Sequence, residues 1–339
     1  MNKKLIALAV AAASISSVAT AAEVYSDETS SLAVGGRLEA RALMSEDNAG
    51  DNQVSDRSRV RMNIAGKTDI TDTVYGIGFY EGEYTSSGTS ADSGNVNNRH
   101  INAGIGGDFG KVVYGKTDGS LGMITDFTDI MSYHGNEAGG KIAAADRTSN
   151  NLAYVGSFDI MGDNLTVKAN YAFEGAKDTD SSDKTTAYGD GYSVGAMYVM
   201  DMGLGFGAGY GEQDVNTFDG KIVDETQKNA FGAISYTYGD FYVSGLYQDS
   251  RNTVADKVQG YEFAAAYTYG KTVFVATYNY LEDKTDNVDV ADSIAVDATH
   301  YFNKNFRTYA SYKFNNLDSK DVGKADASNE FVLGARYDF

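Results

Sequence analysis

The segment FRTYASYKF, residues 306–314, alternates between two kinds of side chain. One set reads Phe, Thr, Ala, Tyr, Phe, and the other reads Arg, Tyr, Ser, Lys. Successive side chains of a β-strand point to opposite faces, so a strand with this sequence presents one apolar face and one polar face. The segments LTVKANYAF, residues 165–173, and VRMNI, residues 60–64, divide in the same way. Many such strands are typical of a membrane β-barrel with an apolar outside and a water-filled inside.

Sixteen segments of this kind run from Leu32 to the last residue, Phe339, and their connections are tight and long in turn. The predicted strands are residues 32–43, 57–67, 73–84, 98–106, 111–116, 151–158, 165–173, 191–200, 204–211, 226–236, 241–248, 259–269, 271–280, 292–301, 306–314 and 330–339. In lipid, strands can satisfy their backbone groups only in a closed barrel. We therefore predict an all-β fold, a 16-stranded antiparallel transmembrane β-barrel. The even strand number places both termini in the periplasm.

The first residues predict export. Two lysines, an apolar run over residues 5–13 and small residues up to Ala21 have the pattern of a secretory signal peptide, residues 1–21. The mature barrel would then span residues 22–339. Its formal charge is 26 − 47 = −21, because Lys3 and Lys4 leave with the signal. No later apolar run approaches the ~20 residues that a membrane helix needs.

Composition argues against catalysis and against a cofactor. The chain has no cysteine, so it has no thiolate chemistry and no cysteine metal site. Its three histidines, His100, His134 and His300, have no nucleophile motif beside them. The acidic balance excludes nucleic acid as a partner. Glycines alternate over residues 203–211, and small residues on one face of a strand allow bending or close contact with another subunit or with a folded-in loop.

Three stretches of the sequence resemble the general porins of Gram-negative outer membranes: AEVY at residues 22–25, YFNKNFRTY at 301–309 and YDF at 337–339. The resemblance covers the whole mature chain. It implies passive diffusion of small hydrophilic solutes and ions across the outer membrane, a homotrimer, and a long third loop, residues 117–150, folded into the lumen. The last strand, with Tyr337 and Phe339, resembles the signal that the barrel-assembly machinery reads.

In that family a basic wall faces carboxylates on the third loop. The resemblance assigns the wall to Arg37, Arg61, Arg99 and Arg147, and the loop acids to Asp126, Asp129 and Glu137. Arg61 shares its strand face with polar residues, which supports it. Arg99 shares its face with Ile101 and Ile105, so only a bulge or a mixed strand would turn it inward.

The acidic balance predicts a modest cation preference, because charges in and around a pore set ion selectivity. The acids expected to crowd the external mouth are Asp47, Asp51, Asp56, Asp178, Asp180, Asp183 and Asp190. Divalent ions could also bridge such loops to lipopolysaccharide. Two other functions stay open at this point. One is a substrate-specific channel, and the other is a barrel that acts mainly as an adhesin or receptor through its external loops.

Overall fold

The structure is a computed structural model that describes residues 21–46, 54–86, 96–175, 187–218, 221–251 and 257–339. The predicted signal peptide lies outside this part except for its last residue. The strands are β1 (Ala22–Ser26), β2 (Ser30–Ser45), β3 (Val54–Asp56), β4 (Arg59–Asp69), β5 (Val74–Thr85), β6 (Asn97–Gly107), β7 (Gly110–Asp118), β8 (Arg147–Ile160), β9 (Asp163–Ala172), β10 (Ala187–Val199), β11 (Leu204–Phe218), β12 (Lys221–Tyr238), β13 (Phe241–Arg251), β14 (Val258–Tyr269), β15 (Thr272–Asp283), β16 (Val288–Tyr301), β17 (Phe306–Asn315) and β18 (Glu330–Asp338). The short helices are α2 (Gly122–Thr125), η1 (Ala143–Ala145) and α3 (Ser319–Val322).

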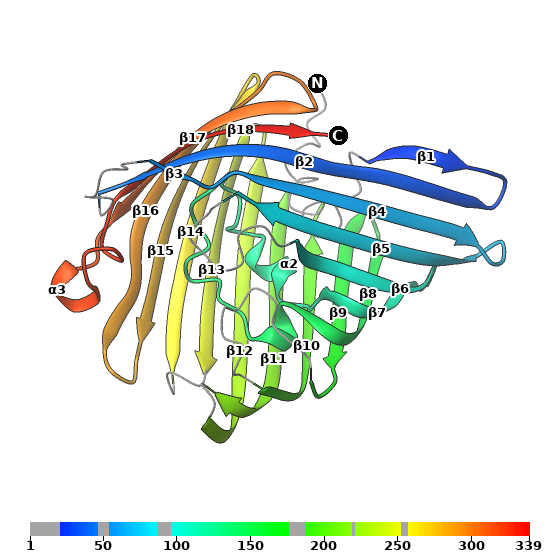
Figure 1. The fold of residues 1–339 in the computed structure, drawn as a ribbon, viewed down its shortest axis with the longest axis horizontal. Coiled ribbons are helices and arrows are strands. Elements are labelled where there is room, and N and C mark those ends of the chain that lie inside the picture. Colours follow the sequence, from blue (N-terminus) through cyan, green and yellow to red (C-terminus); the bar gives the residue numbers. More distant parts are fainter. Residues whose placement is uncertain (1–20, 47–53, 87–95, 176–186, 219–220, 252–256) are drawn as a thin grey trace.

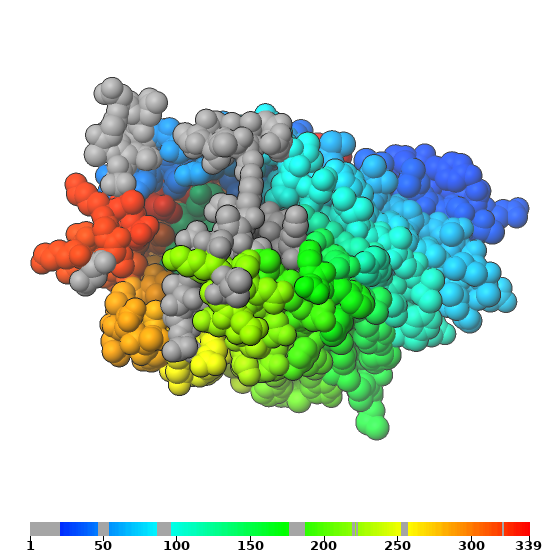
Figure 2. Space-filling view, turned by 60° about the horizontal axis from the view of Figure 1, so that its bottom comes forward, coloured from blue at the N-terminus to red at the C-terminus, as the bar shows by residue number. Residues whose placement is uncertain are grey.

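The strands form one closed antiparallel sheet (Figure 1). Consecutive strands pair all the way round, and β18 returns to pair with β2, placing Asp338 opposite Arg37. Of the eighteen described strands, β1 lies along the start of β2, and β3 continues β4 along the end of β2, which leaves sixteen. The predicted 16-stranded antiparallel barrel is confirmed. In Figure 2 the colours follow the sequence around the molecule, as this neighbour order requires.

Most strand limits agree with the prediction within a few residues, and the clearest difference is the hairpin of β11 and β12. It extends to Phe218 and resumes at Lys221, with Gln213 opposite Gln227. Polar residues predominate on both faces here and the few apolar ones do not alternate, so the pattern gave no strand signal. Backbone pairing needs no apolar side chain, and the ladder continues beyond the apolar part of the strands. Among the described residues no helix is long and apolar enough to cross a membrane.

The barrel wall buries polar side chains and exposes apolar ones, the reverse of a globular protein. On β14, the Glu262 side chain is fully buried, whereas the neighbouring Phe263 is 56% exposed on the outside. Val243 on β13 and Phe274 on β15, both exposed, lie on the same outer surface. A continuous apolar exterior is stable only against lipid or another protein. The polar faces therefore line the interior.

The longest connection, residues 119–146 between β7 and β8, packs against the inward-facing side chains of the barrel wall. Leu121, Ile124 and Phe127 form an apolar cluster with Met197, Phe231 and Leu246 of β10, β12 and β13. A Cβ atom added at Gly209 would lie 2.4 Å from Leu121, and one at Gly207 would lie 3.0 Å from Phe127. The alternating glycines of β11 thus let this segment approach the strand closely, one of the two contacts that the sequence predicted for them.

Hydrogen bonds attach the same segment along its length. The carbonyl oxygen of Phe127 accepts from Tyr242 Oη at 2.7 Å and from Ser244 Oγ at 2.6 Å. Further on, the backbone amide of Ile142 donates to Asn229 and that of Ala144 to Gln213, each at 2.6 Å. Together with contacts to β9, β14, β16 and β17, these bonds attach residues 119–146 to the wall from β9 to β17, and the wall of β2 to β8 lines open space.

Candidate functional site

A cavity of about 1820 Å³ is bounded by the strands from β13 through β18 and β2 to β8, and by part of the segment between β7 and β8. Its charged lining residues in the described structure are basic at Arg37, Arg59, Arg61, Lys67, Arg99, Lys111, Arg147, Lys271, Lys304, Arg307 and Arg336, and acidic at Glu39, Glu81, Asp118, Asp126, Asp129 and Asp338. Basic groups outnumber acidic ones here, although the chain as a whole is acidic. Local charge at this cavity therefore differs in sign from total charge.

The basic wall begins on β2 and β4, where Arg37 and Arg61 are direct cross-strand neighbours. Like charges placed opposite each other repel, so such a pair needs carboxylates nearby. Arg61 donates from Nε to Glu83 Oε2 at 2.9 Å, and its Nη1 lies 3.7 Å from Glu81 Oε1. Arg37 is held more weakly, with Nε 3.8 Å from Glu39 Oε2.

Glu39 is shared by further arginines. Its carboxylate accepts from Arg59 Nε at 2.8 Å and lies 3.0 Å from Arg41 Nη2. At the seam of the barrel, where β18 pairs with β2, Asp338 accepts a hydrogen bond from Arg336 Nε at 2.7 Å and lies 3.5 Å from Arg307 Nη2. The wall is thus a network in which carboxylates neutralise much of the arginine charge.

Arg99 reaches this network through a β-bulge. In the ladder of β5 and β6, Glu81 lies opposite His100, and the next pair is Gly82 with Asn98, so Arg99 has no opposing residue. An extra residue in one strand locally changes which face its side chains take. Arg99 Nε then donates to Glu81 Oε1 at 2.9 Å, and His100 Nε2 lies 2.9 Å from Asp118 Oδ1.

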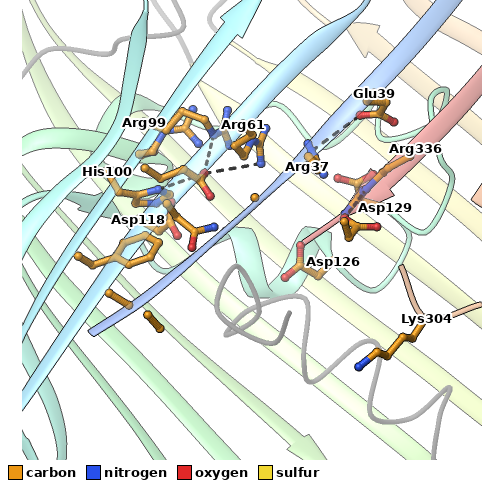
Figure 3. A pocket seen from close by; sticks show the side chains of 18 of the residues that line it. Arg37, Glu39, Arg61, Arg99, His100, Asp118, Asp126, Asp129, Lys304 and Arg336 are labelled. Atoms are coloured by element: carbon orange, nitrogen blue, oxygen red, sulfur yellow. Dashed lines mark hydrogen bonds and ion pairs between the residues drawn. The ribbon is translucent and has the colours of Figure 1, made fainter. Parts of the chain in front are cut away.

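Arg147 is the first residue of β8 and lies opposite Asp118 on β7. It is buried, at 7% exposure, and it lines the cavity. The structure therefore brings all four predicted arginines to one cavity. Figure 3 shows Arg37, Arg61 and Arg99 on the strands and Asp126 and Asp129 on the connecting segment.

Asp126 and Asp129 lie on the segment that follows α2, and both line the cavity. Asp126 is half-buried and Asp129 is exposed. Neither forms an ion pair with another described residue, and Lys141 acts on both carboxylates only from beyond ion-pair distance. Displacement of water by surrounding protein raises the pKa of Asp126 to about 7. The pKa of Asp129 is raised for the same reason.

Glu137 is placed apart from these residues. Its carboxylate accepts from Ser293 Oγ at 2.7 Å and lies 3.2 Å from Lys313 Nζ, on β16 and β17. It is not among the residues that line the arginine cavity. The structure therefore does not bring Glu137 together with the other six predicted residues.

Sequence reasoning missed the carboxylates that pair with the wall. Glu81 and Glu83 follow each other at alternate positions of β5, in the stretch FYEGEYT. Two acids on one face of a strand, flanked by aromatic residues on the other, were a usable sign of an interior position. Arg307 and Arg336 carried a similar sign, since each occupies the polar face of its strand.

The two predicted assembly residues lie at the seam. The rings of Tyr337 and Phe339 stack with centroids 6.4 Å apart. The backbone of Phe339 makes two hydrogen bonds with Gly36 of β2, each 3.0 Å long. The last residue thus helps to join the final strand to the first long one.

Comparison with known proteins gives one consistent result. The family model described as Gram-negative porin matches residues 7–339. Porin-like protein L of Photobacterium profundum is 65% identical, and outer membrane protein U of Vibrio parahaemolyticus is 45% identical, each over the full length of both chains.

Solved structures share the fold. Salmonella typhi OmpF, solved in complex with daunomycin, has a TM-score of 0.78 at 23% identity, covering 94% of this chain and 100% of that one. OmpT of Vibrio cholerae in its trimer form has a TM-score of 0.67 at 20% identity, covering 92% of this chain and 100% of that one. The barrel is closed, with an apolar exterior and a charged interior cavity, and its relatives are porins. The chain therefore belongs to the Gram-negative porin family and is a general porin of the outer membrane.

Proposed function

We propose that solutes pass the narrowest part of this pore between the basic wall of β2, β4, β6 and β8 and the segment of residues 119–146, folded into the lumen. One observation carries the proposal: the cavity has paired arginines on its wall and unpaired Asp126 and Asp129 on that segment. The contacts of the segment with β10 to β13 support its inward position.

Opposed charges across a narrow gap create a transverse field. Such a field orients water and dipolar solutes, and it makes passage of apolar solutes unfavourable. Small hydrophilic solutes and ions then diffuse through without a bound cofactor and without catalysis. The arginine network sets one side of this field, and Asp126 with Asp129 sets the other.

We further propose a modest cation preference. Basic residues outnumber acidic ones in the cavity, and this excess opposes the preference. Glu39, Glu81, Glu83 and Asp338 reduce the excess by pairing with arginines, whereas the two segment carboxylates have no ion-pair partner among the described residues. External acids add to this preference only at short range, because the Debye length is about 8 Å at physiological ionic strength. Of the predicted mouth acids, Asp56 and Asp190 are described, and the others lie outside the described residues.

The assembled state that we propose is a homotrimer. The solved OmpT relative exists in a trimer form, and the apolar exterior of this barrel offers surface for both lipid and a second copy. We also propose that Tyr337 and Phe339 are recognised by the barrel-assembly machinery, and that divalent ions bridge exposed loop carboxylates to lipopolysaccharide.

The test is single-channel recording in a planar bilayer under a salt gradient. We expect current steps in groups of three for the wild-type protein. Asp129→Asn should lower cation preference, because it removes an unpaired negative charge from the gap. Arg61→Ala should raise cation preference, because it leaves Glu81 and Glu83 with less positive charge nearby. If neither substitution shifts the reversal potential, the proposed constriction is wrong although the pore remains. If folded, heat-modifiable protein gives no steps, the channel itself is rejected.

A further inference from the structure

Glu262 of β14 is a buried carboxylate that contacts the inserted segment at two separate points. Its side chain is fully buried. Oε1 accepts a hydrogen bond from the backbone amide of Ala138 at 2.8 Å, and Oε2 accepts one from Thr128 Oγ1. We infer that Glu262 is the positioning residue that fixes residues 128–138 as a rigid tongue beside the pore constriction. This inference rests on the proposed function, since it assumes that this segment narrows the passage.

The two contact points lie at the two ends of the tongue. Thr128 ends the part of the chain that enters from α2, and Ala138 begins the part that leads on to η1. Both residues are fully buried. Between them come Asp129, Ile130, Met131 and Ser132, which line the cavity. A single carboxylate therefore closes the base of the loop that carries Asp129.

The local packing is close enough for this role. A Cβ atom added at Gly260, two residues before Glu262 on the same strand, would lie 3.1 Å from Ala138 Cβ. The absence of that side chain lets the tongue lie directly against β14. A carboxylate suits the site because each of its two oxygens can accept a hydrogen bond from a different donor.

Burying Glu262 is costly for the fold. A buried charge without a compensating partner is unfavourable, and no basic residue forms an ion pair with Glu262 in the described structure. The two donors from the tongue are its recorded hydrogen-bond partners. If the tongue shifted while it still covered Glu262, the carboxylate would lose donors without gaining contact with the pore water. The positions of the carboxylate and the tongue are therefore coupled.

Other contacts hold the tongue at single points nearer its tip. Ser132 Oγ lies 2.7 Å from Thr299 Oγ1, and His134 Nδ1 lies 2.7 Å from Ser311 Oγ. These contacts join one tongue residue at a time to the wall, Ser132 to β16 and His134 to β17 and, through Glu330 at 3.2 Å, to β18. Glu262 differs because it links the entering and leaving chains to each other. Loss of Glu262 should therefore free the position of Asp129 more than loss of any one tip contact.

Two substitutions at Glu262 separate its hydrogen bonds from its charge. Glu262→Ala removes both acceptors. Glu262→Gln keeps both bonds, because its amide oxygen can accept from Ala138 and its amide nitrogen can donate to Thr128 Oγ1. Asn279→Ala is the matched control. Asn279 lies directly opposite Glu262 on β15, is 1% exposed, and bonds to Thr277 and Ser293 of the wall.

Single-channel recordings of the trimer in planar bilayers provide the readout. We expect Glu262→Ala to lose the steady open level and to flicker between conductances, with a less reproducible reversal potential. Glu262→Gln and Asn279→Ala should keep one steady level. A steady wild-type level in Glu262→Ala overturns the inference, and so does flicker in Glu262→Gln equal to that in Glu262→Ala.

Two further variants keep the test decisive. If Glu262→Ala yields no heat-modifiable barrel, Thr128→Val replaces it, since valine has the shape of threonine without the hydroxyl donor. Added flicker in Thr128→Val supports the inference, and a steady level overturns it. Asp129→Asn separates this inference from the proposed function. Unchanged selectivity in Asp129→Asn, together with flicker in Glu262→Ala, would reject charge selection by the tongue while leaving its positioning by Glu262 in place.

Discussion

Arg99 Nε donates to Glu81 Oε1 at 2.9 Å from the extra position of a β-bulge in β6. Simple alternation would point Arg99 toward lipid with Ile101 and Ile105, where an unpaired guanidinium is strongly unfavourable. The bulge turns both Arg99 and His100 toward the interior, and Glu81 lies within ion-pairing distance of each. Glu81 thus joins three basic side chains, because Arg61 also approaches it.

Removing the Glu81 charge should destabilise the barrel. Its side chain is 2% exposed and forms ion pairs with Arg61 and Arg99, which are also largely buried. Breaking a buried ion pair by removing one partner typically costs about 3 to 5 kcal/mol. We therefore expect Glu81→Gln to lower the free energy of unfolding of the detergent-folded protein by an amount in that range, seen as a lower denaturant midpoint. Glu28→Gln, at an exposed position, is the control and should leave the midpoint unchanged. Equal midpoints for both variants would contradict the network.

Ion selectivity should depend on pH through Asp126. Its pKa is raised to about 7, so the carboxylate is charged above pH 7 and neutral below it. Acidification through pH 7 removes a negative charge from the gap, and we expect cation preference to fall. Reversal potentials measured on both sides of pH 7 provide the test. Displacement of water also raises the pKa of Asp129, so its protonation on acidification acts in the same direction.

The control for this titration is Asp126→Asn. His100 lines the same cavity, and histidines also titrate near neutral pH, so the wild-type curve contains both changes. Asp126→Asn retains His100 and should show a smaller dependence, with a cation preference above pH 7 that is already reduced. Identical curves for the two proteins would rule out titration of Asp126 in the pore.

A designed disulfide tests the inward position of residues 119–146. A Cβ atom added at Gly211 of β11 would lie 3.2 Å from Ala145 Cβ, slightly inside the usual disulfide range of about 3.5–4.5 Å. The chain has no other cysteine. We expect Gly211→Cys with Ala145→Cys to form a disulfide on oxidation while the conductance stays unchanged, because the link joins groups already in contact. Each single variant serves as a thiol-reactivity control. Thiols that remain free after oxidation would place the segment elsewhere.

The sequence predicts those features of the fold and the cavity that leave a regular pattern of polar and apolar side chains. Alternation predicted the strands because each wall residue meets either water or lipid. The resemblance assigned Arg61 to the wall, and its polar neighbours on the same strand face supported an inward position. Arg99 did not follow, because a bulge breaks the two-residue period that the prediction used. The bulge was named as one way to turn Arg99 inward, but only the register of β5 and β6 locates it.

Contacts between distant segments left no sequence signal. Glu262 and Ala138 are far apart in the chain, and nothing in either local sequence indicates that they meet. For Glu137 the sequence did suggest a position, but its contacts place it elsewhere. Its position in the third loop resembled that of a constriction acid, but Lys313 and Ser293 hold it on another part of the wall.

The last residue provides a prediction about assembly rather than conduction. The ring of Phe339 packs where a side chain on Gly36 would lie, since an added Cβ there would be 3.0 Å from Phe339 Cζ. Phe339→Ala removes this ring and its stacking on Tyr337, but keeps the two backbone hydrogen bonds with Gly36. We expect a strong loss of heat-modifiable protein in the outer membrane of cells.

The same variant refolded in detergent should form barrels of wild-type conductance, because the ring lies outside the arginine cavity. Tyr337→Phe keeps the aromatic character of the signal and is the matched control, with wild-type levels expected in cells. A recognition role for Phe339 requires this difference between cells and detergent. If Phe339→Ala fails equally in both, the ring stabilises the seam of the barrel, and its proposed recognition by the assembly machinery is wrong.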